Sequence, residues 1–150
     1  QSAKCLRHAL MQRQYFGVIY AGKTENKIDN QTRINMSTQN FAKEWINSWN
    51  SHNLEEILSH YSEDIEITTP MIKLATGSDT DMLKGKENVA NYWKRALDKI
   101  PSLHFELYDV TYGVNSIAIY YKSVMNKKAI EVMFFDQNGK VNKMFAHYTE

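Results

Sequence analysis

The chain has one cysteine, two prolines and six glycines in 150 residues. The single cysteine, Cys5, excludes a disulfide within the chain and a metal site built from several thiolates, which is typical of proteins in a reducing compartment. Long apolar runs are also missing. The longest run near the start, residues 15–21, is too short to span a membrane, and no small-residue cleavage site follows it. We therefore expect a cytoplasmic protein without a membrane partner.

A basic excess is missing from most of the chain. Residues 1–35 hold six Lys or Arg against two acidic residues, whereas residues 36–150 hold 12 against 15. Binding to nucleic acid depends on neutralising phosphates, so we predict no nucleic-acid partner. Metal-ligand patterns are absent as well, because no two histidines stand at i and i+4 and the carboxylates are scattered. We predict no metal and no cofactor.

The first part of the sequence differs from the rest. Residues 1–35 show neither a sustained helical nor an alternating pattern, which predicts a poorly ordered N-terminal extension followed by one domain over residues 36–150. Ser37 or Thr38 can cap the first helix of that domain. The extension is either a leader, an upstream or added segment, a basic arm for an acidic partner, or a source of one extra edge strand.

Helical spacing of apolar residues predicts three helices in the first half of the domain. The first carries Phe41, Trp45, Ile46 and Trp49, and a turn at residues 51–53 leads to the second, with Leu54, Ile57, Leu58 and Tyr61. Alternation from Ile65 to Thr69 predicts a short strand that Pro70 stops. After a loop at residues 75–81, the third helix spans residues 87–99.

Strand-like runs dominate the second half. They cover residues 103–112, 116–125, 129–135 and 141–148, and short turns between them predict an antiparallel meander. The whole pattern predicts an α+β fold with helices on one sheet face. Bulky residues at successive positions, as in residues 133–135, indicate that the outer face also needs cover, so we expect a homodimer through that face.

The order of these elements resembles a known superfamily. The segments WINSWNSHNLEEILSHYSEDIEITTP, LKGKENVANYW, IEVMFFDQNGKV and MFAHY together resemble the nuclear transport factor 2-like superfamily, in its SnoaL-like and ketosteroid isomerase-like branch. The resemblance covers residues 41–148. It implies a cone-shaped fold in which three N-terminal helices pack on a curved, mostly antiparallel sheet and enclose one hydrophobic pocket.

The same resemblance points to catalytic positions. In steroid isomerases a Tyr and a protonated Asp donate hydrogen bonds to an oxyanion while a second Asp moves the proton, and these positions become Trp45, Glu131 and Thr69 in this chain. Thr69 lacks useful basicity, so we do not predict steroid isomerase activity. If the domain is catalytic, another base is needed, and His104 is our candidate, with a surface or dimer-interface histidine as the alternative.

Glu131 shares the parity of Ala129, Met133 and Phe135, which predicts that it points into an apolar pocket with a raised pKa. A neutral carboxyl group can donate a hydrogen bond to a carbonyl, enolate or phenol oxygen. The alternative is a structural network with Tyr or Trp partners.

Two functions remain open. The first is a pocket that binds a small hydrophobic carbonyl or phenolic metabolite, with or without cofactor-free isomerisation, cyclisation or dehydration. The second is a non-catalytic ligand-binding or protein-interaction module. The predicted ligand-binding residues are Trp49, Tyr61, Thr69, Met71, Tyr92, Trp93, Met133, Phe135, Met144 and Tyr148.

Overall fold

The structure, a computed structural model, describes residues 39–150. The predicted N-terminal extension lies outside the described residues, and the division of the chain at residue 35 stays a prediction. The first described helix spans residues 39–50. The elements that follow are α3 (Leu54–Ser59), β1 (Tyr61–Thr68), α4 (Pro70–Thr76), β2 (Met82–Lys84), α5 (Lys86–Lys99), β3 (Glu106–Gly113), β4 (Ser116–Lys122), η1 (Val124–Asn126), β5 (Lys128–Phe135) and β6 (Val141–Tyr148).

The six strands form one curved sheet in the order β2-β1-β6-β5-β4-β3. Strands β3 to β6 are the predicted meander, and each pairs antiparallel with the next. The pairing between β1 and β6 is parallel, with Ile67 opposite Met144. The predicted α+β fold with a mostly antiparallel sheet is confirmed.

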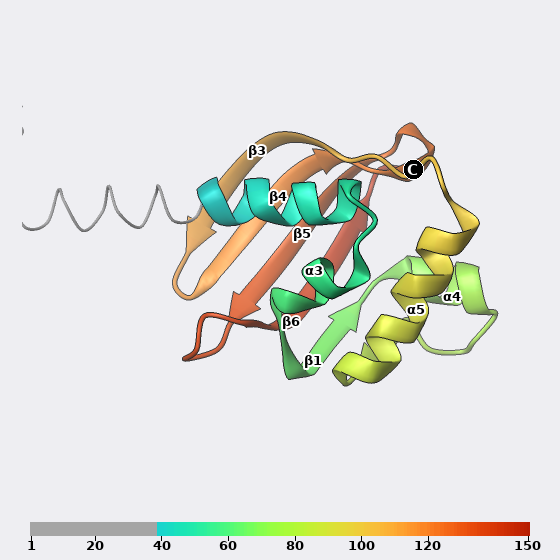
Figure 1. Ribbon diagram of the computed structural model, residues 1–150, viewed down its shortest axis with the longest axis horizontal. Helices are drawn as coiled ribbons and strands as arrows, with labels where there is room; N and C mark the ends of the chain where they lie inside the picture. The colour runs from blue at the N-terminus through green and yellow to red at the C-terminus, as the bar shows by residue number, and fades with distance from the viewer. Residues whose placement is uncertain (1–38) are drawn as a thin grey trace, which may run out of the picture. The chain divides into compact units, whose positions relative to one another are not determined.

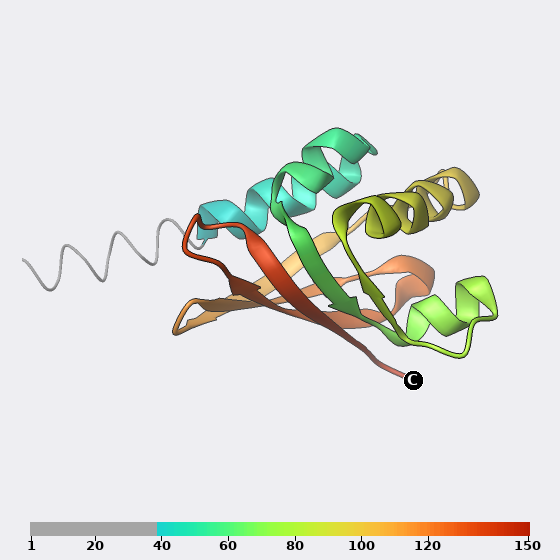
Figure 2. The ribbon, with the colours of Figure 1, turned by 90° about the horizontal axis from the view of Figure 1, so that it is seen from below.

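The helix over residues 39–50, α3 and α5 lie on one face of this sheet, as Figures 1 and 2 show. The Asn53 side chain caps α3 by accepting hydrogen bonds from the backbone N–H groups of Glu55 and Glu56. Short α4 lies beyond the end of β1 in both views. The buried side chains of the helices and of the sheet form one core between these layers. Its largest fully buried members include Trp45, Tyr61, Tyr121, Ile57, Ile65 and Met133.

Two predictions in the first half need correction: the predicted end of the second helix is wrong, and the helix α4 was not predicted. Tyr61 begins β1 instead of ending the second helix, because α3 stops at His60, whose N–H bonds back to the carbonyls of Ile57 and Leu58. Pro70 does stop β1, but it also starts α4. The Thr69 side chain caps α4 by accepting from Met71 N–H, and a proline at the first helical position loses no hydrogen bond.

Two boundaries in the second half also differ. Residues 103–105 precede β3 as an irregular segment, and residues 124–126 form the 3₁₀ turn η1 instead of extending β4. The segment before β3 is held by the Asn50 side chain, which donates to the Phe105 carbonyl at 2.9 Å and accepts from the Phe105 N–H at 2.7 Å. This side chain replaces the strand partner that the backbone lacks there.

Among residues 39–150, no helix is long and apolar enough to cross a membrane. The cytoplasmic location and the lack of a nucleic-acid partner stay predictions.

Candidate functional site

A cavity of about 270 Å³ lies between the helices and the inner sheet face. Most of the predicted site residues line it: Trp45, Trp49, Thr69, Met71, Tyr92, Trp93, Glu131, Met144 and Tyr148. They come from the helix over residues 39–50, from α4, α5, β5 and β6, and from the junction of β1 with α4. The sequence pattern therefore placed residues from both halves of the domain around one cavity.

Three residues predicted to bind ligand do not line the cavity. Tyr61 and Met133 are fully buried in the core instead. Phe135 packs edge-on against Phe41, with ring centroids 5.0 Å apart, at the end of β5. These side chains point to the inner face of the sheet, but the cavity occupies only one part of that face.

The cavity also includes residues that the sequence did not reveal. Phe105 lies in the irregular segment before β3, Tyr121 and Ser123 lie at the end of β4, and Leu74 belongs to the unpredicted helix α4. Alternate residues of β4 are buried, namely Ile117, Ile119 and Tyr121. This alternation is the sequence pattern from which the inward position of Tyr121 could have been predicted. No pattern in the sequence indicated α4.

The mouth of the cavity lies between α4 and η1. Leu74 and Met125 line the cavity, yet their exposed fractions are 78% and 72%, so these side chains mark where it opens to solvent. Lys99, at the end of α5, is an exposed cationic residue that also lines the cavity. Apart from Ala75, which is also exposed, the remaining lining residues are buried or half-buried, so the cavity opens to solvent beside Leu74 and Met125.

Aromatic rings build the wall opposite the sheet. Trp49 lies edge-on to Trp93, with ring centroids 5.2 Å apart. The Trp45 ring stacks on Phe105 at 5.8 Å, and Phe105 contacts Tyr121 at 4.8 Å. Such contacts add to the stabilisation from burial alone and hold the rings in place. The rings therefore give the cavity a preformed apolar wall.

The Trp45 N–H is not available to a ligand, in contrast to the predicted role as an oxyanion donor. It donates to the Tyr61 hydroxyl at 2.7 Å, and that hydroxyl lies 3.8 Å from the Met144 sulfur. Both side chains are fully buried. A buried N–H and hydroxyl satisfy one another here, so Trp45 contributes its ring to the cavity and its N–H to the core.

Glu131 lies on β5 with 4% of its surface exposed. Its Oε1 accepts a hydrogen bond from the Tyr121 hydroxyl at 2.8 Å, whereas Oε2 has no partner among the described residues. Burial raises the pKa of Glu131 to about 8, and the Tyr121 hydrogen bond partly opposes this rise. At neutral pH the carboxyl group is mostly protonated, and its O–H is free to donate to a ligand.

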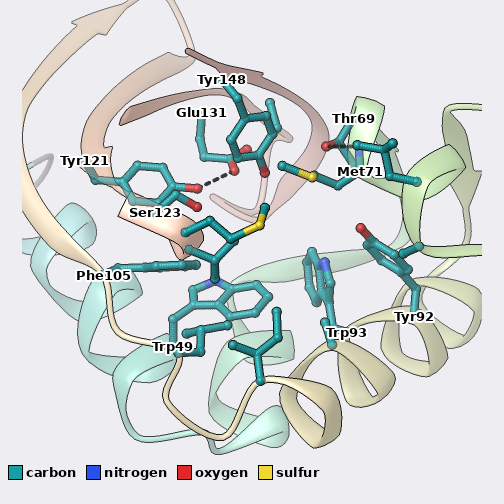
Figure 3. A pocket seen from close by; sticks show the side chains of 18 of the residues that line it. Trp49, Thr69, Met71, Tyr92, Trp93, Phe105, Tyr121, Ser123, Glu131 and Tyr148 are labelled. Atoms are coloured by element: carbon teal, nitrogen blue, oxygen red, sulfur yellow. Dashed lines mark hydrogen bonds between the residues drawn. The ribbon is translucent and has the colours of Figure 1, made fainter. Parts of the chain in front are cut away.

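Phenols surround this carboxyl group. Figure 3 shows Tyr121 and Tyr148 on the same side of the cavity as Glu131, with Trp49, Trp93 and Tyr92 across from them. Burial, reinforced by the Glu131 charge, raises the pKa of Tyr92 to about 12 and holds the pKa values of Tyr121 and Tyr148 above their usual range. These phenols stay neutral at physiological pH. Glu131 is thus the cavity group whose pKa lies closest to neutrality.

His104 is not brought to Glu131. It is exposed and lines a separate surface hollow, because its neighbours Leu103 and Phe105 take the buried positions. The predicted pair of a His104 base and a Glu131 donor therefore has no support in the geometry. Thr69 serves as the N-cap of α4. Within residues 39–150, no cluster of His, Cys, Asp or Glu has the arrangement of a metal site.

A curved sheet with helices on one face and a cavity between them is the arrangement that this domain shares with solved proteins of the nuclear transport factor 2-like fold. The SnoaL-like domain family matches residues 42–147, so the chain belongs to this family.

Solved structures agree with this assignment. A SnoaL-like protein of unknown function from Burkholderia thailandensis is 43% identical over 75% of this chain and 94% of its own, with a TM-score of 0.73. An NTF2-like protein from Burkholderia xenovorans is 13% identical over 77% of this chain and 85% of its own, with a TM-score of 0.62. A protein with a cystatin-like fold from Methylobium petroleophilum is 12% identical over 77% of each chain, with a TM-score of 0.61. Among curated proteins, none matches the chain.

Proposed function

We propose that this SnoaL-like domain binds one small, mainly apolar molecule through a carbonyl or phenol oxygen. The observation that carries the proposal is Glu131 Oε2, a buried polar atom that has no partner within residues 39–150, on a side chain that lines the cavity. A buried polar group left unsatisfied costs about 1–3 kcal/mol, and a ligand oxygen at this position removes that cost. The protonated carboxyl group donates, and the ligand oxygen accepts.

The rest of the cavity supports the same class of ligand. Trp49, Trp93 and Phe105 present flat apolar surfaces, and the volume of about 270 Å³ is close to the lower limit of small-molecule sites. Tyr92, Tyr148 and Ser123, which also line the cavity, can donate further hydrogen bonds to a polar substituent. A planar molecule of a few rings with one ketone or phenol oxygen fits these walls.

A cofactor-free proton transfer is the second function we propose, in the form of an isomerisation, cyclisation or dehydration. The observation in its favour is the pKa of Glu131, which at about 8 lies near the working pH of most cells. Glu131 itself would both donate and accept the proton, because His104 lies elsewhere. A non-catalytic binding module is the alternative, and it needs the same hydrogen bond without any turnover.

Titration with a fluorescent naphthyl ketone, 2-acetyl-6-methoxynaphthalene, tests the binding proposal. We expect binding at pH 7 that weakens at least tenfold by pH 9.5, because ionised Glu131 can no longer donate to the ketone oxygen. In Glu131→Gln the amide still donates, so this variant should bind the ketone with little change between the two pH values.

Glu55→Gln is the matched control, since Glu55 is an exposed carboxylate on α3 outside the cavity. This variant should show the same pH dependence of ketone binding as the natural protein. Absence of binding by the natural protein at millimolar ketone, or equal affinity at both pH values, contradicts the proposal. NMR can measure the exchange of the acetyl methyl protons for deuterium in deuterated water. Exchange that the protein accelerates indicates proton transfer in addition to binding.

We also propose that the domain forms a homodimer through the outer sheet face. Strand β5 directs Ile130 and Phe134 to that face, where they are 41% and 39% exposed, and Phe134 contacts Phe145 edge-on. Exposed aromatic and aliphatic side chains on a sheet face are typical of protein interfaces. Sedimentation should show a dimer that Phe134→Glu dissociates while ketone binding persists. A natural protein that sediments as a monomer at high concentration rules the dimer out.

A further inference from the structure

A second hollow, of about 280 Å³, adjoins the cavity near its mouth. Its own lining is polar and comes from Ser102, His104, Glu106, Lys122 and Asn126. The two spaces share a wall that includes Leu103, Val124 and Met125. The cavity and the hollow therefore adjoin at these residues, and their chemistry differs.

One side of the shared wall is held in place. The Leu103 carbonyl lies 2.8 Å from His52 Nε2, and the Phe105 backbone makes two hydrogen bonds with the Asn50 side chain. These contacts tie the segment before β3 to the turn after the first described helix. In this segment the His104 side chain is exposed to solvent and the Leu103 side chain is buried.

The other side of the wall is η1. Met125 and Asn126 both have left-handed backbone conformations, with φ of 54° and 61°. Such values are uncommon for residues with a side chain, and strained residues of this kind cluster at ligand sites. The Met125 side chain is 72% exposed and lines both spaces. Because methionine is unbranched and adaptable, this exposed side chain can adopt other rotamers beside a bound molecule.

The charges differ between the two spaces. Apart from Lys99 at the mouth, the only acidic or basic residue from the described part of the chain that lines the cavity is Glu131, whose buried carboxyl group is mostly neutral at pH 7. The hollow holds Lys122, whose ammonium group lies 4.0 Å from a Glu106 carboxylate oxygen in an exposed pair. An exposed pair at that distance is weak, so Lys122 can turn to another anion. His104 beside it offers a further N–H donor.

We propose that the hollow binds a carboxylate on the far end of the same ligand, with Lys122 and His104 as its partners. The ligand class is then an elongated aromatic or alicyclic keto acid or hydroxy acid. Its ring system lies in the cavity with one oxygen on Glu131, and its acid chain passes Met125. This assignment rests on the proposed function and adds the chemistry of the ligand's outer end.

Two probes that differ in one group test the proposal. The first is the naphthyl ketone with a propanoate chain in place of the methoxy group, and the second is the corresponding propanamide, which has the same shape without the charge. At pH 7 and low salt we expect the acid to bind about tenfold tighter than the amide. In Lys122→Gln this preference should fall to about twofold or less.

Lys94→Gln is the matched control, because Lys94 lies on α5 outside both spaces and pairs with Asp98. It should keep the full preference for the acid. Equal affinity for acid and amide in the natural protein, with the ketone still bound, overturns the second site but leaves the proposed function standing. A preference that Lys99→Gln removes and Lys122→Gln keeps places the carboxylate at the cavity mouth and also overturns the assignment. If none of the three probes binds, both proposals fail together.

Discussion

Replacing Glu131 by Gln should change how the stability of the domain depends on pH. The pKa of this carboxyl group is about 8 in the folded protein, against 4.5 as the ordinary value. The folded state therefore holds a proton that the unfolded state releases, and stability contributed by the neutral acid is lost as pH rises from 4.5 through 8. A glutamine side chain has nearly the same shape, can still accept from Tyr121, and does not titrate.

The size of the effect follows from those two pKa values. Each unit of difference corresponds to about 1.4 kcal/mol, so the free energy of unfolding of the natural protein, relative to Glu131→Gln, should fall by about 4 kcal/mol between pH 5 and pH 9. Because Glu131 is 4% exposed, solvent screening reduces this value little.

Urea unfolding of both proteins at five pH values, followed by tryptophan fluorescence, measures the difference. The comparison cancels the titration of all groups that the two proteins share. A difference in unfolding free energy that stays constant from pH 5 to pH 9 would refute the reasoning. It would mean that the Glu131 carboxyl group ionises as freely in the folded protein as in the unfolded chain.

Three further substitutions have defined outcomes. Tyr121→Phe removes the hydrogen bond to Glu131 Oε1 that lowers the pKa of Glu131; the pH at which ketone binding is half lost should rise, and an unchanged midpoint contradicts the role of this hydroxyl. Asn50→Ala breaks two hydrogen bonds to the Phe105 backbone and should lower the free energy of unfolding by about 2 kcal/mol in urea. Asn47→Ala, at an exposed position of the same helix, should cost much less. Trp45→Phe leaves the buried Tyr61 hydroxyl without its donor, so it should destabilise the domain by about 2 kcal/mol in urea, and unchanged stability contradicts the role of this hydrogen bond.

Strand parity accounts for most of what the sequence could predict about the site. Side chains alternate between faces along a strand, so the apolar neighbours Ala129 and Met133 were enough to place Glu131 inside. The same rule explains the position of His104. Leu103 and Phe105 are buried on either side of it, and a histidine between two buried residues of an extended segment must face outward.

The partners of these residues could not be predicted in the same way. Tyr121 reaches Glu131 because Ile119 pairs with Glu131 across β4 and β5, which places Tyr121 at a diagonal position. The register between β4 and β5 depends on the bend of the chain at η1, and no local sequence pattern indicates that bend. The hydrogen bond from Trp45 to Tyr61 was hidden for a related reason. Tyr61 stands four residues after Ile57, which is the spacing of one helix face. It belongs to a strand because α3 ends at His60.

Helix α4 was missed because its signal is short. Thr69 followed by Pro70 marks the end of a strand as well as the start of a helix, and seven residues are too few to show a helical period. Because α4 forms one side of the cavity mouth, that side of the site was not predicted either. Residues at the cavity mouth were therefore less predictable than the buried residues that line its interior.

The parallel pairing of β1 with β6 also bears on the order in which this domain is made. A nascent chain that has emerged as far as β5 has its helices and three strands of the meander, but β1 still lacks the strand that joins it to them. The core can close only after β6 leaves the ribosome. During this interval the core around Trp45, Trp49 and Trp93 lacks Val141 and Met144 of β6, and such dependence on a non-local pairing predicts slow folding for a domain of this length.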